Sequence, residues 1–154
     1  MNKILYCLLI MATALTIVSC GDNGGKELTS INPGLYEIEF QLKYGSQLTL
    51  MKQRIRYNSE ATYESTSFQD NTAIEELKGK FKIENKQLVF FDNYYRLITQ
   101  EGSWIQKEPS KVAVRKIKKR SYQYYFQFPN DQTREQYKGI GLSEGWKTYT
   151  RISD

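Results

Sequence analysis

The sequence predicts an all-β fold, a single antiparallel up-and-down β-barrel of about eight to ten strands. The chain of 154 residues contains 12 Tyr, 7 Phe and 2 Trp, and aromatic side chains favour pleated, half-buried surfaces over helices. After residue 33, apolar and polar residues alternate with a period of two, and turn-forming residues separate these runs at short intervals. A two-sheet sandwich would produce the same pattern. A closed barrel, however, leaves no unpaired edges that invite aggregation.

The first 20 residues predict a lipoprotein signal. Lys3 supplies a positive charge, and Ile4 to Val18 form an apolar run of about 15 residues, shorter than the roughly 20 that a membrane-spanning helix needs. The run ends in Ile17-Val18-Ser19-Cys20, which resembles the lipobox of bacterial lipoproteins. The resemblance implies cleavage between Ser19 and Cys20 and lipidation of Cys20, so that acyl chains hold the protein on a membrane. An uncleaved membrane segment and an ordinary secretory signal are the alternatives.

The chain therefore divides into three parts. Residues 1–19 are the predicted signal peptide, residues 20–33 a lipidated, glycine-rich tether, and residues 34–154 the barrel domain. By the lipoprotein resemblance, Gly21 after the cysteine favours the outer membrane, because aspartate at that position retains enteric lipoproteins in the inner membrane. We expect a lipid-anchored protein of the cell envelope, with the membrane as its partner through the Cys20 anchor.

Period-two runs and turn signals define the expected strands. Asn85-Lys86 fits a two-residue hairpin turn, and Asp92-Asn93 and Ser143-Glu144-Gly145 are also predicted turns. Two short helical turns are expected, at Thr72–Glu75, which looks like a capping box, and from Asn130 to Lys138. The expected strands are 35–43, 47–57, 61–68, 77–84, 88–91, 94–98, 111–118, 121–128, 136–142 and 145–152.

A second resemblance covers most of the barrel domain. The segments "GLYEIEF", "TYESTSF", "LKGKFKIENKQLVFF" and "WKTYTRI" resemble the meander of small lipocalin-like lipoproteins of bacteria. This resemblance implies an up-and-down barrel. The Gly-x-Trp motif of lipocalins does not occur near the first strand, and a shared fold does not by itself assign a function.

Aromatic residues on the predicted inner faces are candidates for a ligand pocket. They can line an apolar cavity for a small apolar ligand, with tyrosine hydroxyls as polar groups. Alternatively, they fill the interior, as side chains do in small barrels. The candidates are Tyr36, Phe40, Phe81, Phe90, Trp104, Tyr122, Tyr124 and Phe126.

The densest run of charge is a candidate anion contact. It comprises Arg115, Lys116, Lys118, Lys119 and Arg120, within a chain of net charge +5. These cations suit anionic lipid headgroups or an acidic partner. The alternative is a solvated hairpin tip whose charge prevents edge pairing. No nucleic-acid partner is expected, because the signal directs the protein out of the cytoplasm.

Several kinds of chemistry lack their usual residues. The chain has no His, and its two cysteines, Cys7 and Cys20, lie in the first 20 residues, so no zinc site, imidazole base, metal or cofactor is expected. Glu37 and Glu39 lie about 7 Å apart by strand geometry, on the face predicted to be solvated. We therefore expect a non-catalytic binding module for a small apolar ligand. A protein-facing module, such as an assembly partner or an inhibitor of a lytic enzyme, is the alternative, and a hydrolase-like enzyme is third.

Overall fold

The computed structural model describes residues 27–98 and 102–154. Within these residues nearly all regular structure is antiparallel β, as the sequence predicts. The elements are β1 (Gly34–Tyr44), β2 (Gln47–Tyr57), β3 (Thr62–Gln69), β4 (Thr72–Glu84), β5 (Gln87–Leu97), β6 (Ile105–Lys107), β7 (Ser110–Arg115), β8 (Ser121–Phe126), α1 (Asp131–Gln136) and β9 (Gly145–Ser153).

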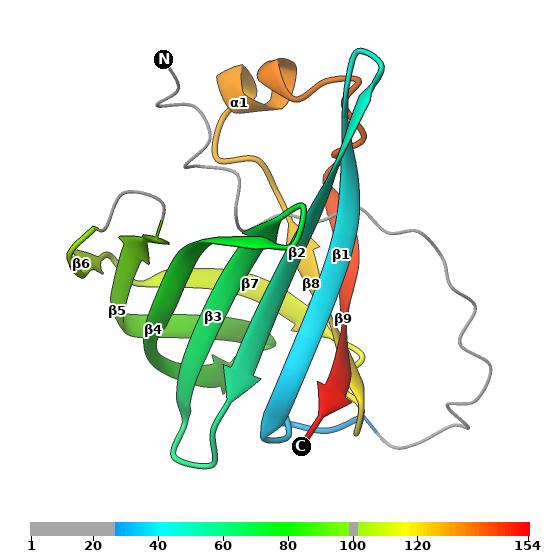
Figure 1. The fold of residues 1–154 in the computed structure, drawn as a ribbon. Helices are drawn as coiled ribbons and strands as arrows, with labels where there is room; N and C mark the ends of the chain where they lie inside the picture. Colours follow the sequence, from blue (N-terminus) through cyan, green and yellow to red (C-terminus); the bar gives the residue numbers. More distant parts are fainter. Residues whose placement is uncertain (1–26, 99–101) are drawn as a thin grey trace.

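Eight of the nine strands close into a barrel. The order around the sheet is β4-β3-β2-β1-β9-β8-β7-β5, and an additional pairing of β4 with β5 completes the ring. Strand β5 is long enough to serve two neighbours, since its first half pairs with β7 and its second half with β6. The up-and-down barrel predicted from the sequence is confirmed (Figure 1).

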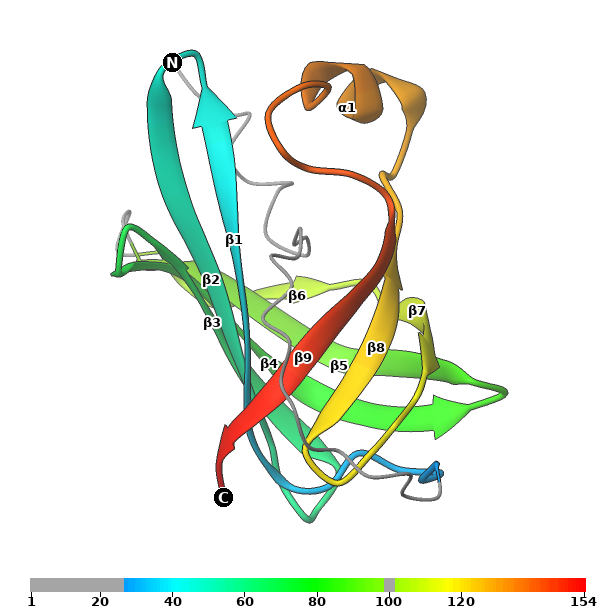
Figure 2. The same cartoon turned by 90° about the vertical axis from the view of Figure 1, so that its right-hand side faces the viewer.

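The barrel has two distinct ends. We call the base the end that carries the turn 58–61 and the loop 116–120, with the C-terminus beside them (Figure 1). The hairpin turn 85–86 projects from the side of the lower half of the barrel (Figure 2). The opposite, upper end carries the β1–β2 hairpin turn and α1 (Figure 2). Residues 27–33 run along the base next to the loop 116–120, where the chain enters β1 (Figure 2).

Two-residue turns with left-handed backbone connect β3 to β4 and β4 to β5. Asn85 and Lys86 have φ of 51° and 59°, which confirms the predicted hairpin turn. Asp70 and Asn71 have φ of 47° and 66°, and Gln69 pairs with Thr72 directly after them. The expected helical turn at Thr72–Glu75 is therefore wrong, because β4 already begins at Thr72.

The expected turn at Asp92-Asn93 is a β-bulge inside one continuous strand. Lys80 pairs with Phe91 and Lys78 with Tyr94, so Asp92 and Asn93 together face a single residue, Gly79. Asp92 has φ of 52°, as the bulge requires. A Cβ atom at Gly79 would lie 2.7 Å from Asn93 Oδ1 and 2.9 Å from the Phe91 carbonyl oxygen, so only glycine fits opposite this bulge.

The segment between β8 and β9 is helical rather than a strand. The expected helical turn after Asn130 is confirmed, because α1 begins at Asp131 and the Asn130 Oδ1 atom accepts a hydrogen bond of 2.8 Å from the Thr133 amide. The expected strand 136–142 is wrong, because the chain leaves α1 at Gln136 and turns. Strand β9 instead pairs with β8 and β1.

Tyrosine rings fill the lower half of the barrel. Tyr36, Tyr57 and Tyr122 are at most 1 % exposed, and their ring centroids lie 5.5–6.0 Å apart. The hydroxyls of Tyr57 and Tyr122 share a hydrogen bond of 2.8 Å. Ile31 and Ile117, both 5 % exposed, close the base. We call Tyr36, Tyr57 and Tyr122 the tyrosine layer.

Replacing Gly79 with alanine is expected to destabilise the barrel by about 1–3 kcal/mol, because the added methyl overlaps backbone oxygen atoms that cannot move without breaking the β4–β5 pairing. Urea unfolding followed by circular dichroism measures this loss. Gly45→Ala is the matched control for a glycine with open space around it, although its φ of 62° carries its own smaller backbone cost. Equal stability of Gly79→Ala and the wild type would contradict the bulge.

Candidate functional site

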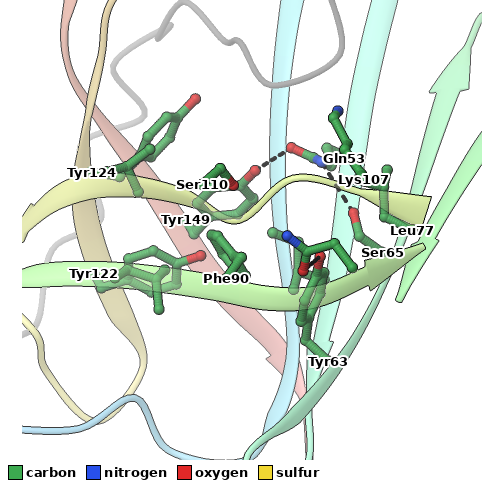
Figure 3. A pocket seen from close by; sticks show the side chains of 14 residues that line it. Gln53, Tyr63, Ser65, Leu77, Phe90, Lys107, Ser110, Tyr122, Tyr124 and Tyr149 are labelled. Carbon is green, nitrogen blue, oxygen red and sulfur yellow. Dashed lines mark hydrogen bonds between the residues drawn. The ribbon is translucent and has the colours of Figure 1, made fainter. Parts of the chain in front are cut away.

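A cavity of about 90 Å³ lies inside the barrel above the tyrosine layer (Figure 3). Its apolar wall comes from β2, β4, β5 and β7, and its polar residues come from β2, β3 and β5 to β9, with two each from β3 and β8. Alternation along each strand explains the arrangement, since every second side chain points inward. The lining residues are Gln53, Ile55, Tyr63, Ser65, Leu77, Leu88, Phe90, Asn93, Lys107, Ser110, Val112, Tyr122, Tyr124 and Tyr149.

A hydrogen-bonded chain crosses one wall of the cavity. The Tyr149 hydroxyl donates to Gln53 Oε1, and Gln53 Nε2 donates to Ser65 Oγ at 3.0 Å (Figure 3). Gln53 and Ser65 are 7 % and 3 % exposed, so these bonds satisfy groups that water does not reach. The Ser65 hydroxyl accepts in this chain, and its own proton is free to point into the cavity.

A second polar pair rests on the bulge in β5. Asn93, which is 2 % exposed, accepts a hydrogen bond of 3.0 Å from the Tyr63 hydroxyl and donates to the Glu108 carbonyl at 3.4 Å. The bulge aims Asn93 inward, because the extra residue at Asp92 changes which side chains face the interior. Burial raises the pKa of Tyr63 to about 12, so the phenol remains a donor at neutral pH.

The cavity reaches the surface where β6 ends and β7 begins. Lys107 and Ser110 are the lining residues that are exposed, and they flank the short connection between these strands. The Lys107 ammonium lies 5.6 Å from the centroid of the Tyr95 ring. This edge, in the upper half of the barrel, is the mouth of the cavity.

A buried carboxyl lies one residue pair beyond the cavity wall. Glu75 pairs across the strands with Ser67, next to the pair of Leu77 and Ser65 that lines the cavity. Glu75 is 4 % exposed, and burial raises its pKa to about 7, while the charge of Lys107 acts in the opposite direction. Ser67 is fully buried, and its hydroxyl has no hydrogen-bond partner among the described residues.

The sequence interpretation missed Glu75. It assigned this residue to a helical turn, whereas a period of two counted back from Leu77 places Glu75 on the inner face. The signal that identifies the strand is Asp70-Asn71, since both residue types tolerate the left-handed conformation of a two-residue hairpin turn.

The eight aromatic candidates occupy three different places. Phe90, Tyr122 and Tyr124 lie in the cavity wall. Trp104 lies on the outer face of the barrel, where the Lys78 ammonium and the Arg96 guanidinium are 4.1 and 4.8 Å from its ring centroid. The remaining candidates are buried in the core outside the wall: Tyr36, Phe40, Phe81 and Phe126.

The basic segment is divided between a wall and a loop. Arg115 packs on the outer wall, with its Nε donating to Gln123 Oε1 at 2.9 Å and its guanidinium 4.0 Å from the Trp146 ring centroid. Lys118 is partly exposed. Lys116, Lys119 and Arg120 are exposed on the loop at the base.

The other sequence candidates carry no catalytic arrangement. Glu37 and Glu39 face outward and pair with Arg54 and Lys52 at 2.7 and 2.8 Å. Between residues 27 and 98 and from 102 onward, no three acidic side chains gather as a metal site would require. The same residues include no helix of the length and apolarity needed to cross a bilayer. Ser19 and Cys20, with the predicted signal peptide, lie outside the described residues.

Comparisons with protein-family models, with curated proteins and with solved structures found no match to this chain.

Glu75 is expected to make the protein less stable as the pH rises. The pKa of Glu75 is about 7 in the folded protein and 4.5 in the unfolded chain. The contribution of Glu75 to the free energy of unfolding is therefore most favourable below about pH 4.5 and falls until about pH 7. The loss from this one group is about 3 kcal/mol. Glu75→Gln should remove it, so that the variant gains stability relative to the wild type between pH 4 and 8 in urea titrations.

The matched control is Glu76→Gln, since Glu76 faces outward and pairs with Arg96 at 2.6 Å. This variant should retain the fall in stability between pH 4 and 8. Parallel stability curves for the wild type and Glu75→Gln over that range would contradict the buried position of the carboxyl.

Proposed function

We propose that this protein is a lipid-anchored binding module of the cell envelope, and not an enzyme, and that its barrel holds a small, neutral, mostly apolar molecule. The observation that carries the proposal is the cavity of about 90 Å³ among Leu77, Phe90 and Val112, with hydrogen-bonding groups on one wall. The resemblance to small lipocalin-like lipoproteins concerns the barrel fold, so the proposal of a ligand rests on the cavity itself.

The cavity volume limits the size of the ligand. Pockets for drug-sized ligands measure roughly 300–1,000 Å³, whereas one water needs only about 10–15 Å³. An apolar cavity of about 150 Å³ accepts benzene. At about 90 Å³, this cavity is smaller than the one that accepts benzene, so it suits a short alkyl chain, or a single aromatic ring that extends into the open mouth.

The wall chemistry favours a neutral ligand with one polar group. Gln53, Tyr63 and Asn93 are uncharged and already bond to protein groups. The charged lining residue, Lys107, lies at the mouth, so the interior of the cavity presents no charge to an ion. The Ser65 hydroxyl retains a proton that a ligand oxygen can accept. Phenol combines an apolar ring with one hydroxyl and is therefore a suitable probe.

Val112→Phe is expected to weaken phenol binding at least tenfold, because the added ring occupies the cavity that Val112 lines. An NMR titration of the wild type and the variant with phenol measures the change. Val89→Phe is the matched control, since Val89 lies on the neighbouring strand β5, opposite Lys111, on the outer face. Equal affinity of the wild type and Val112→Phe, or no binding to the wild type, would contradict the proposal.

The anchor rests on the lipobox-like Ile17-Val18-Ser19-Cys20 and the apolar run before it. Its acyl chains make attachment effectively permanent when several are present, since each buried CH2 contributes about 0.8 kcal/mol. By the lipoprotein resemblance, the outer membrane is the proposed location.

Cys20→Ala is expected to abolish lipidation, because no other cysteine follows the signal peptide. The variant should lose the mass of the acyl chains and either leave the membrane fraction or remain an uncleaved precursor. Intact-mass spectrometry and membrane fractionation measure both outcomes. If Cys20→Ala had the same mass shift and membrane association as the wild type, the anchor would be disproved.

A protein-facing module is the second candidate. The β1–β2 hairpin projects from the upper end of the barrel, and Tyr44 and Leu48 near its tip are 44 % and 60 % exposed (Figure 1). Exposed apolar side chains on a projecting element are typical of protein contacts. The phenol experiment separates the candidates, because a protein contact at the hairpin does not need the cavity.

A further inference from the structure

We propose that the base of the barrel is a docking surface for anionic phospholipid headgroups, which orients the protein on its membrane. This inference rests on the proposed Cys20 anchor and adds a defined orientation to it. The docking surface consists of the exposed cations Lys116, Lys119 and Arg120 on the loop 116–120, together with the exposed Lys86. The Lys86 carbonyl accepts a hydrogen bond of 2.8 Å from the Val114 amide, two residues before Lys116.

The chain reaches the barrel at this surface. The Leu28 amide donates to the Ile117 carbonyl at 2.7 Å, and the Lys116 amide donates to the Glu27 carboxylate at 2.6 Å. Ile31, which is 5 % exposed, packs into the core directly before β1. Residues 27–33, which the sequence interpretation placed in the tether, therefore belong to the base, and the tether ends beside the basic loop (Figure 2).

The length of the remaining tether keeps the basic loop close to the bilayer. Glu27 follows Cys20 by seven positions. A chain of that length spans at most about 25 Å when fully extended. The upper end is farther from the anchor, because β1 leads away from the base for 11 residues. The base is therefore the end that meets the headgroups first.

The loop presents its cations outward in a fixed conformation. Ile117, at 5 % exposure, anchors the loop in the core, and the Lys118 amide donates to the Ser121 carbonyl at 2.8 Å. Because Ile117 points inward, the neighbouring Lys116 and the following Lys119 and Arg120 project into solvent. A preformed cationic surface loses little conformational entropy when it meets a membrane.

The charges of the base favour an anionic surface. No acidic residue interrupts positions 115–120. Glu84 and Asp154 are paired with Lys82 and Arg151 at 2.8 and 2.9 Å. Glu27 and Glu60 are two further exposed carboxylates. They stand against four exposed cations, Lys86, Lys116, Lys119 and Arg120, so positive charge is in excess.

A cation near an anionic leaflet strengthens binding about five-fold. The anchor adds to this effect, because it holds the base at a high effective concentration beside the lipid. In the resulting orientation the mouth of the cavity lies in the side of the barrel beside β6, above the base (Figure 1), so a ligand enters from the aqueous side.

Fluorescence quenching on vesicles tests the orientation. Lipidated protein carries a fluorophore either on Ser59→Cys, at the base, or on Leu48→Cys, at the upper end. It is reconstituted in phosphatidylcholine vesicles that contain roughly one third phosphatidylglycerol and a lipid with a nitroxide on its headgroup. Labelling is specific, because Cys7 is removed with the signal peptide and the Cys20 sulfur is alkylated. We expect at least three-fold stronger quenching at position 59 than at position 48.

Charge variants test the cause. The triple variant Lys116→Gln/Lys119→Gln/Arg120→Gln should remove the difference between the two positions. A matched triple variant elsewhere, Lys43→Gln/Lys111→Gln/Lys138→Gln, should preserve it, since these exposed lysines lie away from the base. Raising the salt from about 0.1 to 1 M should also reduce the difference, because the screening length falls from about 10 to 3 Å. Equal quenching at both positions, or a difference that the first triple variant keeps, would overturn the inference.

Failure of the anchor gives a different result from failure of the docking surface. Intact-mass spectrometry of the same preparation shows whether Cys20 carries lipid. If Cys20 is unmodified, the anchor is disproved, and sedimentation with the same vesicles still tests the base. The wild type should then prefer vesicles with phosphatidylglycerol, and the first triple variant should lose about 100-fold in partitioning. Equal partitioning of both proteins would overturn the docking surface.

Discussion

The hydrogen bond between the phenols of Tyr57 and Tyr122 is the interaction on which the interior of this barrel depends. It joins β2 to β8, which are three strands apart around the ring, at a point where water does not reach. With Tyr36 packed against both rings, the lower half of the barrel is solid. The space that remains lies above this layer, where Ser65, Val112 and Leu77 are too small to meet across the barrel. Both the closed base and the cavity follow from where the large side chains lie.

The two ends of the molecule consequently have different properties. The base is closed by Ile31 and Ile117, carries the exposed cations and receives the chain from the N-terminal side. The upper half contains the cavity, the buried Glu75 and the mouth at Lys107. Because the mouth lies in the upper half and the cations lie at the base, a contact at the base leaves the cavity accessible. The anchor, docking surface and ligand site proposed above are compatible for this reason.

The sequence predicted the architecture well, because strand periodicity is a local signal. The alternation through residues 36–42 places four apolar side chains inward, and all four are buried, while Asn85-Lys86 forms the turn expected of it. Errors arose where one residue type has two structural uses. Asp92-Asn93 resembles a hairpin turn but makes a bulge, which only the pairing of β4 with β5 through Gly79 distinguishes. The position of Trp104 on the outer face likewise depends on Lys78 and Arg96 from other strands. The cavity is a property of packing, so no local pattern could predict its volume.

The central claim is that the barrel is solid below the Tyr57–Tyr122 bond and hollow above it. A crystal structure determined under xenon pressure tests this most directly, because xenon occupies apolar cavities without needing a polar contact. The account predicts one xenon site in the described part of the barrel, between Leu77, Phe90 and Val112. The absence of xenon at that site, or its presence among Tyr36, Tyr57 and Tyr122, would contradict it.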